Sequence, residues 1–229
     1  AVIGGGSSGL GVALDAISRG LSVVLLEKAD FAKGTSSRST KLVHGGVRYL
    51  AQGDIALVLE ALKERGMLLK NAPHLTQNQP FIIPIYTWWD RIQYSAGLKI
   101  YDWMAGKLRL GKSRFISKSE TIRRLPSVNQ DQLKGGVVYH DGQFDDARLA
   151  LNIAQTADEM GACILNYIKV SGLVKNESGK ITGLSLIDEQ SKEKLTIQAK
   201  MVVNATGVFA DKILQMDNPE APKTIQPSQ

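Results

Sequence analysis

Three glycines and one glutamate near the start of the chain have the types and spacing that bind a dinucleotide. Gly4, Gly6 and Gly9 follow the apolar residues 1–3 in the pattern Gly-x-Gly-x-x-Gly. The first two allow a tight turn that leaves backbone amides open to a pyrophosphate, and the third allows a helix to pack closely on a strand. Glu27 follows about 20 residues later, where a carboxylate can accept hydrogen bonds from ribose hydroxyls.

A strand, a helix and a second strand must position these residues. Apolar residues recur at helical spacing as far as Ile17, and Gly20 can adopt the left-handed conformation that ends a helix. Residues 22–26 then predict a strand that ends at Glu27. This order favours a dinucleotide-binding unit over a glycine-rich turn of purely structural use.

Composition limits the class of protein. Of the 229 residues 43% are hydrophobic, and no apolar run is long enough to cross a membrane as a helix. Because Cys163 is the one cysteine, an internal disulfide and a cysteine metal cluster are excluded, and we predict no metal site. The apolar neighbours of Cys163 favour a buried thiol. The net charge of +6 favours an anionic partner, but no nucleic-acid-binding motif accompanies it, so we expect no nucleic-acid partner.

Two further elements can be predicted along the chain. Asp54 has the type and place of a helix cap, and Ile55, Val58 and Leu62 follow at the spacing of a buried stripe. Residues 81–86 read as a strand near two prolines, which indicates an edge strand or a bend.

A second unusual stretch, residues 34–50, reads GTSSRSTKLVHGGVRYL. It is rich in hydroxyl residues and glycine, and it carries several cations. A solvated surface loop is the simplest interpretation. Its short donors and close backbone approach would also suit a planar, phosphate-bearing cofactor along its length.

This stretch closely resembles a signature of the FAD-dependent glycerol-3-phosphate dehydrogenases, which belong to the D-amino-acid-oxidase-like flavoproteins. HGGVRYL is its most specific part. Four other segments resemble signatures of the same family in the family's order: residues 61–74, 85–89, 137–149 and 203–207. The family continues beyond Gln229, so we expect a fragment of a longer chain, with the catalytic base and other substrate-site residues outside it.

The resemblance implies an α/β fold: a Rossmann-like FAD-binding domain with a β-meander, and a smaller antiparallel α+β substrate domain. We expect residues 1–77 and 144–229 to form the two parts of the FAD-binding domain and residues 78–143 to form part of the substrate domain. Residues 162–199 contain strand-like runs separated by local turns, which predicts the three-stranded antiparallel meander.

The resemblance also implies which residues contact the cofactor and the substrate. Arg48 is expected to hold the substrate phosphate or polarise the reacting oxygen, and Tyr49 to position it; an ion pair within the cofactor loop is the alternative for Arg48. The expected FAD-binding residues are Gly4, Gly6, Ser7, Ser8, Gly9, Glu27, Lys28, Thr35, Ser36, Ser37, Ser39, Thr40, Lys41, Leu42, His44, Gly45, Gly46, Val170, Ala205, Thr206 and Gly207.

The activity implied is the oxidation of sn-glycerol 3-phosphate to dihydroxyacetone phosphate, with hydride transfer to FAD and electrons passed to quinone. Two alternatives stay open. One is an oxidase that uses oxygen on the same substrate. The other is a non-catalytic FAD-binding or assembly fragment.

Aromatic residues are concentrated between residues 81 and 103, which hold seven of the fourteen in the chain, and no acidic residue lies between Asp102 and Glu120. The aromatics could form a core and the cations a solvated face. Alternatively, the region could lie on a membrane surface, where aromatic rings and cations meet headgroups. Enzymes of the family that this chain resembles work bound to the membrane. The resemblance thus implies a cytoplasmic protein, peripheral on the inner face of the cell membrane, with the mitochondrial inner membrane as the alternative. A homodimer is left open.

Overall fold

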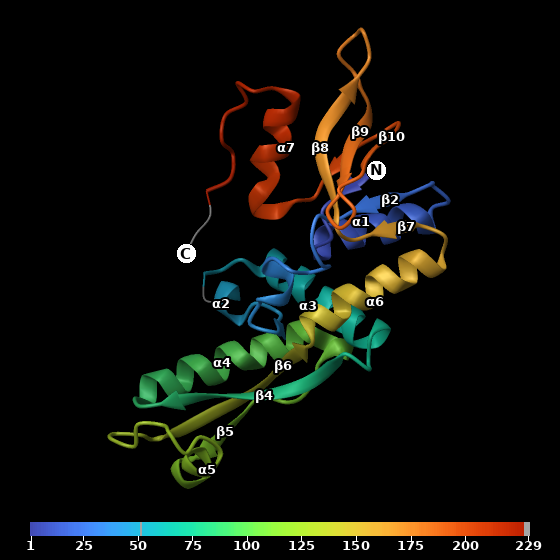
Figure 1. The fold of residues 1–229 in the computed structure, drawn as a ribbon. Coiled ribbons are helices and arrows are strands. Elements are labelled where there is room, and N and C mark those ends of the chain that lie inside the picture. The colour runs from blue at the N-terminus through green and yellow to red at the C-terminus, as the bar shows by residue number, and fades with distance from the viewer. Residues whose placement is uncertain (51, 227–229) are drawn as a thin grey trace. The chain divides into compact units, whose positions relative to one another are not determined.

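The computed structural model describes residues 1–50 and 52–226, apart from the side chain of Arg48. The chain divides into two units: unit 1 comprises Ala1–Ser39 with Asp146–Gln229, and unit 2 comprises Thr40–Asp145 (Figure 1). Each unit has its own hydrophobic core. The expected substrate domain, residues 78–143, lies within unit 2, and residues 40–77 also group with unit 2 rather than with the rest of the chain.

Unit 1 is built on a parallel sheet in the order β11-β1-β2-β7. Val2 and Leu25 of this sheet pack with Leu10 and Ala154 in one core cluster. The strands are β1 (Val2–Ile3), β2 (Val24–Leu26), β7 (Cys163–Leu165) and β11 (Val203–Asn204), and the helices of the cluster are α1 (Ser7–Ser18) and α6 (Asp146–Glu159).

A second, antiparallel sheet completes unit 1 and has the order β10-β9-β8 (Figure 1). Leu184 and Leu186 of this sheet pack on Ile3 and Leu26, so the two sheets share a core. The strands are β8 (Ile168–Lys175), β9 (Ile181–Asp188) and β10 (Lys194–Gln198); α7 (Ala210–Asp217) and two short 3-10 helices, Thr35–Ser37 and Gly207–Phe209, complete the unit.

The predicted order of elements in unit 1 is confirmed, with two differences. Strand, helix and strand follow in the expected order, and Gly20 ends the helix region with a φ of 79°. The meander is antiparallel but begins at Ile168, because Cys163–Leu165 at the start of the predicted range 162–199 pair in parallel with β2. The prediction that Cys163 is buried is wrong. It is the first residue of β7, the edge strand of the parallel sheet, and its side chain is exposed at this edge.

Unit 2 is an antiparallel sheet around the long strand β6, with helices packed on it (Figure 1). β6 pairs with β4 along its full length and with β3 and β5 at its two ends. The strands are β3 (Leu42–Val43), β4 (Thr76–Ile85), β5 (Arg114–Ser117) and β6 (Gly135–Phe144); the helices are α2 (Val47–Leu50), α3 (Ile55–Asn71), α4 (Trp88–Ala105) and α5 (Lys118–Arg124), with a 3-10 helix at Gly106–Leu108.

The predicted cap and edge strand of unit 2 are confirmed. The Asp54 side chain accepts a hydrogen bond from the Leu57 amide at 3.1 Å, and β4, which carries the two prolines, lies at the edge of the sheet order. Val58 and Leu62 are buried against Tyr101 of α4, but Ile55 is 55% exposed. The buried stripe therefore begins one turn later than predicted, because Ile55 lies in the first turn of α3, outside this cluster.

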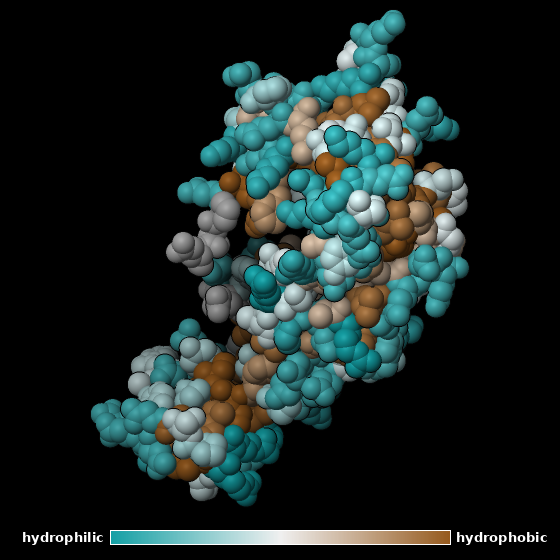
Figure 2. Space-filling model, in the orientation of Figure 1, coloured by the Kyte–Doolittle hydropathy of each residue, from teal (hydrophilic) through white to brown (hydrophobic). Residues whose placement is uncertain are grey.

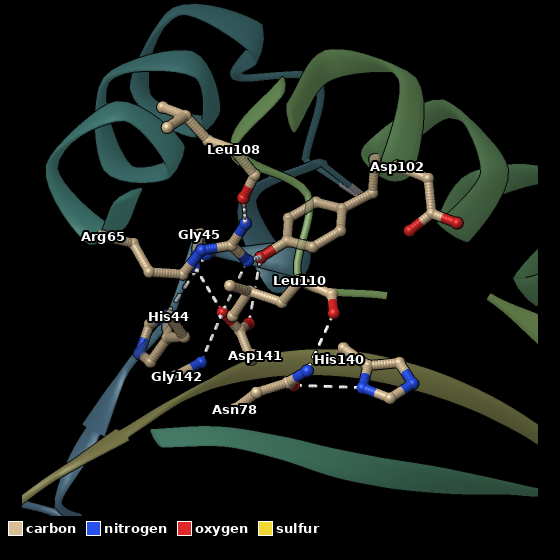
Figure 3. A network of polar contacts seen from close by, with 12 residues as sticks. His44, Gly45, Arg65, Asn78, Asp102, Leu108, Leu110, His140, Asp141 and Gly142 are labelled. Atoms are coloured by element: carbon tan, nitrogen blue, oxygen red, sulfur yellow. Dashed lines mark hydrogen bonds and ion pairs between the residues drawn. The ribbon is translucent and has the colours of Figure 1, made fainter. Parts of the chain in front are cut away.

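A buried ion pair lies at the centre of unit 2 (Figure 3). Nη1 of Arg65 on α3 donates to Oδ1 of Asp141 on β6 at 2.9 Å, and the hydroxyl of Tyr101 on α4 donates to Oδ2 at 2.9 Å. All three side chains are almost inaccessible to solvent. The Gly45 amide also donates to Oδ1, at 3.2 Å, and Nη2 of Arg65 donates to the Leu108 carbonyl at 3.1 Å. One carboxylate thus joins two helices, a strand and the turn at residues 44–46, which we call the HGG turn.

Burial and charge keep the Tyr101 hydroxyl of this network protonated. Burial, and after it the negative charge of Asp141, raises the pKa of Tyr101 above its ordinary value. Tyr101 therefore stays a phenol and a hydrogen-bond donor across the physiological pH range. The charge of Arg65 is balanced by Asp141, although Nε of Arg65 is buried without a hydrogen-bond partner among the described residues.

The Asp141→Asn variant should be strongly destabilised, because it leaves the Arg65 charge buried without a carboxylate. We expect a loss of about 3–5 kcal/mol in the free energy of unfolding. Urea unfolding followed by tryptophan fluorescence measures this loss. Asp131→Asn removes an exposed carboxylate from the same unit and should change stability by less than about 0.5 kcal/mol. Equal stability of the two variants would contradict a structural role for the buried pair.

Candidate functional site

Steric contacts require glycine in the first turn of unit 1. Gly4 has a φ of 111°, and a Cβ at this position would meet the carbonyl group of Ala205. A Cβ at Gly9 would collide with the carbonyl oxygen of Gly4. The Gly4 amide also donates to the Leu26 carbonyl at 2.9 Å. The ends of β1, β2 and β11 and the start of α1 therefore converge at this turn, and only glycine fits where their backbones approach.

The N-terminus of α1 presents backbone amides beside residues 35–39, which we call the serine-rich segment. Gly6 caps the helix and has no side chain to occupy the free amides of the first turn. The Ser7 amide donates to Oγ of Ser36 at 2.9 Å, and the two serine hydroxyls lie 3.2 Å apart. Ser8 is exposed in the same turn, and Thr35 and Ser37 flank Ser36 in its 3-10 helix. Amides and hydroxyls gathered at a helix N-terminus suit a phosphate group.

Glu27 is held in place by two backbone amides. Its Oε2 accepts a hydrogen bond from the Gly5 amide at 2.7 Å, and its Oε1 accepts one from the Ala29 amide at 2.8 Å. A carboxylate has about four acceptor positions, so each oxygen can accept one more hydrogen bond. Glu27 therefore links the glycine turn to the end of β2 and retains the capacity to bind ribose hydroxyls. Nζ of the next residue, Lys28, lies 4.2 Å from the ring centre of Phe209.

Ser39 lies at the end of the first segment of unit 1 and contacts the start of α6. Its amide and hydroxyl donate to Oδ2 of Asp146 at 3.2 and 2.8 Å. Asp146 is buried, and its other oxygen accepts a hydrogen bond from the Ala147 amide at 2.8 Å. The serine-rich segment is thus tied to unit 1 at Ser36 and at Ser39.

The segment Ala205–Thr206–Gly207 follows β11 and lies against the glycine turn through Ala205. Oδ1 of Asn204 accepts hydrogen bonds from the hydroxyl of Thr206 at 2.7 Å and from its amide at 3.3 Å, which fixes the turn. Gly207 has a φ of 56°. Val170 on β8 is buried in the core cluster of Ile3 and Leu26, so its side chain belongs to the core, and its predicted contact with FAD stays a prediction.

In unit 2 the other candidate residues form a strand and a turn. Leu42 pairs with Gln143 of β6, and it follows the exposed residues Thr40 and Lys41. A Cβ at Gly45 would collide with Leu62 and with the hydroxyl of Tyr101, so the buried network and this turn are packed without space between them.

The HGG turn leads directly into α2. Gly46 has a φ of 74° and donates its amide to Nδ1 of His44 at 3.2 Å. Arg48 belongs to α2, but its side chain lies outside the described residues, so its predicted contact stays a prediction. Tyr49 is 40% exposed, and its amide donates to the Gly46 carbonyl at 2.8 Å.

The predicted site residues therefore fall into two groups. The predicted residues in unit 1 are Gly4 to Gly9, Glu27, Lys28, the serine-rich segment, Val170 and residues 205–207. The predicted residues in unit 2 all lie between residues 40 and 49. Sequence reasoning missed the buried network that anchors Gly45. One signal was present: Arg65 follows Leu62 by three residues and continues the buried stripe of α3.

The family model for FAD-dependent oxidoreductases (DAO) matches residues 1–229. Among curated proteins, the chain is 47% identical over 98% of its length to the mitochondrial glycerol-3-phosphate dehydrogenase of Schizosaccharomyces pombe. It is 50% identical over 94% of its length to that of Saccharomyces cerevisiae. It covers 36% and 34% of these two proteins, about a third of their length.

Among solved structures, the glycerol-3-phosphate dehydrogenase of Bacillus halodurans complexed with FAD matches with a TM-score of 0.73 and 36% identity. That match covers 95% of this chain and 36% of the other. L-proline dehydrogenase from P. horikoshii, at 22% identity and a TM-score of 0.70, shares the fold. The Rossmann-like sheet, the glycine turn that no other residue type fits, and a family match over the whole chain agree: this chain belongs to the FAD-dependent oxidoreductase family.

Proposed function

We propose that this chain is part of an FAD-dependent glycerol-3-phosphate dehydrogenase that oxidises sn-glycerol 3-phosphate to dihydroxyacetone phosphate. The observation that carries the proposal is the 47–50% identity, over nearly the whole chain, to proteins of that name. The FAD-bound structure of a similar dehydrogenase supports FAD as the cofactor. The HGGVRYL segment, which resembles a signature of these enzymes, supports the substrate.

Unit 1 supplies the groups for the FAD adenosine and pyrophosphate. The amides at the N-terminus of α1, together with the hydroxyls of Ser7 and Ser36, would bind the pyrophosphate. The carboxylate of Glu27 would accept the ribose hydroxyls through its remaining acceptor positions. Residues 40–46 of unit 2 would contact the flavin part. Bound FAD supplies the electron sink that accepts hydride from C2 of the substrate.

Arg48 and Tyr49 are the candidates to orient the substrate. A guanidinium is a permanently charged, forked donor that matches a phosphate or a reacting oxygen. The short helix α2 carries both residues and follows directly from the HGG turn, which the Asp141 carboxylate holds at the Gly45 amide. Substrate binding by these residues would orient the reacting carbon and lower the entropic part of the barrier.

The finer assignments belong to the same proposal. The curated relatives are named dehydrogenases and not oxidases. This favours quinone over oxygen as the electron acceptor. They are also named mitochondrial, which favours the mitochondrial inner membrane over a bacterial cell membrane. A homodimer is compatible with the proposal but not needed by it.

Peripheral contact with a membrane is supported by α4. Trp88, Trp89 and Trp103 are 58%, 79% and 81% exposed. Figure 2 shows hydrophobic and hydrophilic side chains side by side on the visible face of unit 2. Exposed indole rings next to cations suit the headgroup region of a bilayer. None of the helices in the described residues is both long and apolar enough to cross a membrane.

Glu27→Gln should weaken FAD binding by about 1–3 kcal/mol, the range for hydrogen bonds to a charged group, because the amide has one acceptor oxygen in place of two. Titration of the full-length apoprotein with FAD measures this change. Glu177→Gln removes an exposed charge from the β8–β9 turn of the same unit and should leave the affinity unchanged. Unchanged affinity in Glu27→Gln would remove the ribose assignment.

Arg48→Lys in the full-length enzyme should retain bound flavin and lose much of kcat/KM on glycerol 3-phosphate, because lysine keeps the charge but lacks the forked donors. Flavin absorbance and steady-state kinetics with a soluble acceptor measure the two effects. Arg19→Lys is the matched control and should behave as the parent, because Arg19 caps the C-terminus of α1 and forms an exposed ion pair with Asp15. Loss of both flavin and activity would assign Arg48 to the cofactor loop, and normal kinetics would exclude its substrate role.

A further inference from the structure

A cavity of about 280 Å³ lies in unit 2 between α4 and β5, on the sheet strand β6. It is separate from the turns that carry the candidate FAD and substrate residues. Val137 and Phe115 contribute apolar surface. Three of the side chains that line it are cationic, and two more are serines: Arg91, Lys99, Arg114, Ser95 and Ser113. The cavity is at the small end of the range for ligand sites, so it would hold a compact charged group.

Helix α4 faces this cavity with a row of polar side chains. Arg91, Ser95 and Lys99 are spaced four residues apart, so they lie one above the other on one face of the helix. Of these, Lys99 is exposed and the other two are half-buried. A guanidinium, a hydroxyl and an ammonium therefore line one wall.

The guanidinium of Arg91 is held in position by two aromatic rings. Its Cζ lies 4.1 Å from the ring centre of Phe115 on β5 and 5.1 Å from that of Trp88 on α4. Stacking of this kind orients the planar group without using its N–H donors. Less side-chain entropy is then lost when those donors bind a ligand.

Several donors of the cavity have no hydrogen-bond or ion-pair partner among the residues that the structure describes. Within residues 1–50 and 52–226, neither Arg91 nor Lys99 has an ion-pair partner, and the side chains of Arg91, Ser95 and Lys99 form no hydrogen bond. The acidic residues nearby are already engaged. Glu120 pairs with Arg114 at 2.9 Å and with Arg124 at 2.8 Å, and Asp102 accepts hydrogen bonds from Ser113.

We propose that this cavity binds a phosphate group, supplied by the headgroup of an anionic lipid. The free donors are a forked guanidinium, an ammonium and a hydroxyl, which together match a tetrahedral anion with several oxygens better than a single carboxylate. The cavity residue Arg91 stacks on Trp88, which is exposed and belongs to the surface proposed above to contact lipid. A headgroup at the cavity would therefore be close to indole rings at headgroup depth.

This inference rests on the membrane contact in the proposed function, and the test separates the two. Full-length protein is mixed with vesicles of phosphatidylcholine alone, and with vesicles that also contain phosphatidylglycerol, at constant ionic strength. Sedimentation measures binding. Inorganic phosphate is titrated in parallel by calorimetry. The test variant is R91Q/K99Q. The control K63Q/K70Q removes two exposed charges from α3 of the same unit and so has the same net charge.

We expect the parent to bind phosphatidylglycerol vesicles more tightly than phosphatidylcholine vesicles. R91Q/K99Q should lose roughly tenfold or more of that binding, since each substitution replaces a charged donor by a neutral one and so removes a charge-assisted hydrogen bond. K63Q/K70Q should lose clearly less, and activity on glycerol 3-phosphate with a soluble acceptor should be unchanged in both variants.

Three results would overturn the inference in different ways. Equal losses in the two variants would mean that only net charge matters and that the cavity is no site. Phosphate binding that R91Q/K99Q abolishes, without any preference for phosphatidylglycerol, would make the source a small solute and reject the lipid. Tight binding to phosphatidylcholine and phosphatidylglycerol vesicles alike would leave the membrane contact standing and reject the headgroup site.

Discussion

The carboxylate of Asp141 is the constraint on which unit 2 depends. A buried charge is costly unless it is paired and its remaining acceptor positions are filled. Asp141 meets both conditions through Arg65, Tyr101 and the amides of Gly45 and Gly142. Because these partners come from α3, α4, β6 and the turn before α2, the order of unit 2 and the position of its candidate substrate residues rest on one interaction.

Unit 1 depends instead on the close approach of backbones. β1, β11 and α1 meet where Gly4 faces the Ala205 carbonyl and Gly9 faces the Gly4 carbonyl. Glu27 then ties the turn to the end of β2 through the Gly5 and Ala29 amides. The candidate residues of the two units are therefore held in place differently. In unit 2 a buried ion pair positions them, and in unit 1 glycines without side chains allow the backbones to approach closely.

Local patterns predicted most of the fold. The glycine turn, the Asp54 cap, the edge strand with two prolines and the meander each depend on neighbouring residues, and each is present. What could not be predicted depends on distant partners. Asp141 lies 76 residues from Arg65, so no local pattern pairs them. Cys163 is exposed because β7 is an edge strand of its sheet. Ile55 is exposed because the contact between α3 and α4 begins further along α3, at Val58.

The central claim is that the full-length protein uses FAD to oxidise glycerol 3-phosphate. The most direct test is the visible absorbance of the purified protein under anaerobic conditions, before and after addition of glycerol 3-phosphate. Our account predicts the spectrum of bound oxidised flavin, followed by bleaching in proportion to the substrate added. A flavin spectrum that glycerol 3-phosphate leaves unchanged, or a protein that purifies and reconstitutes without flavin, would contradict it.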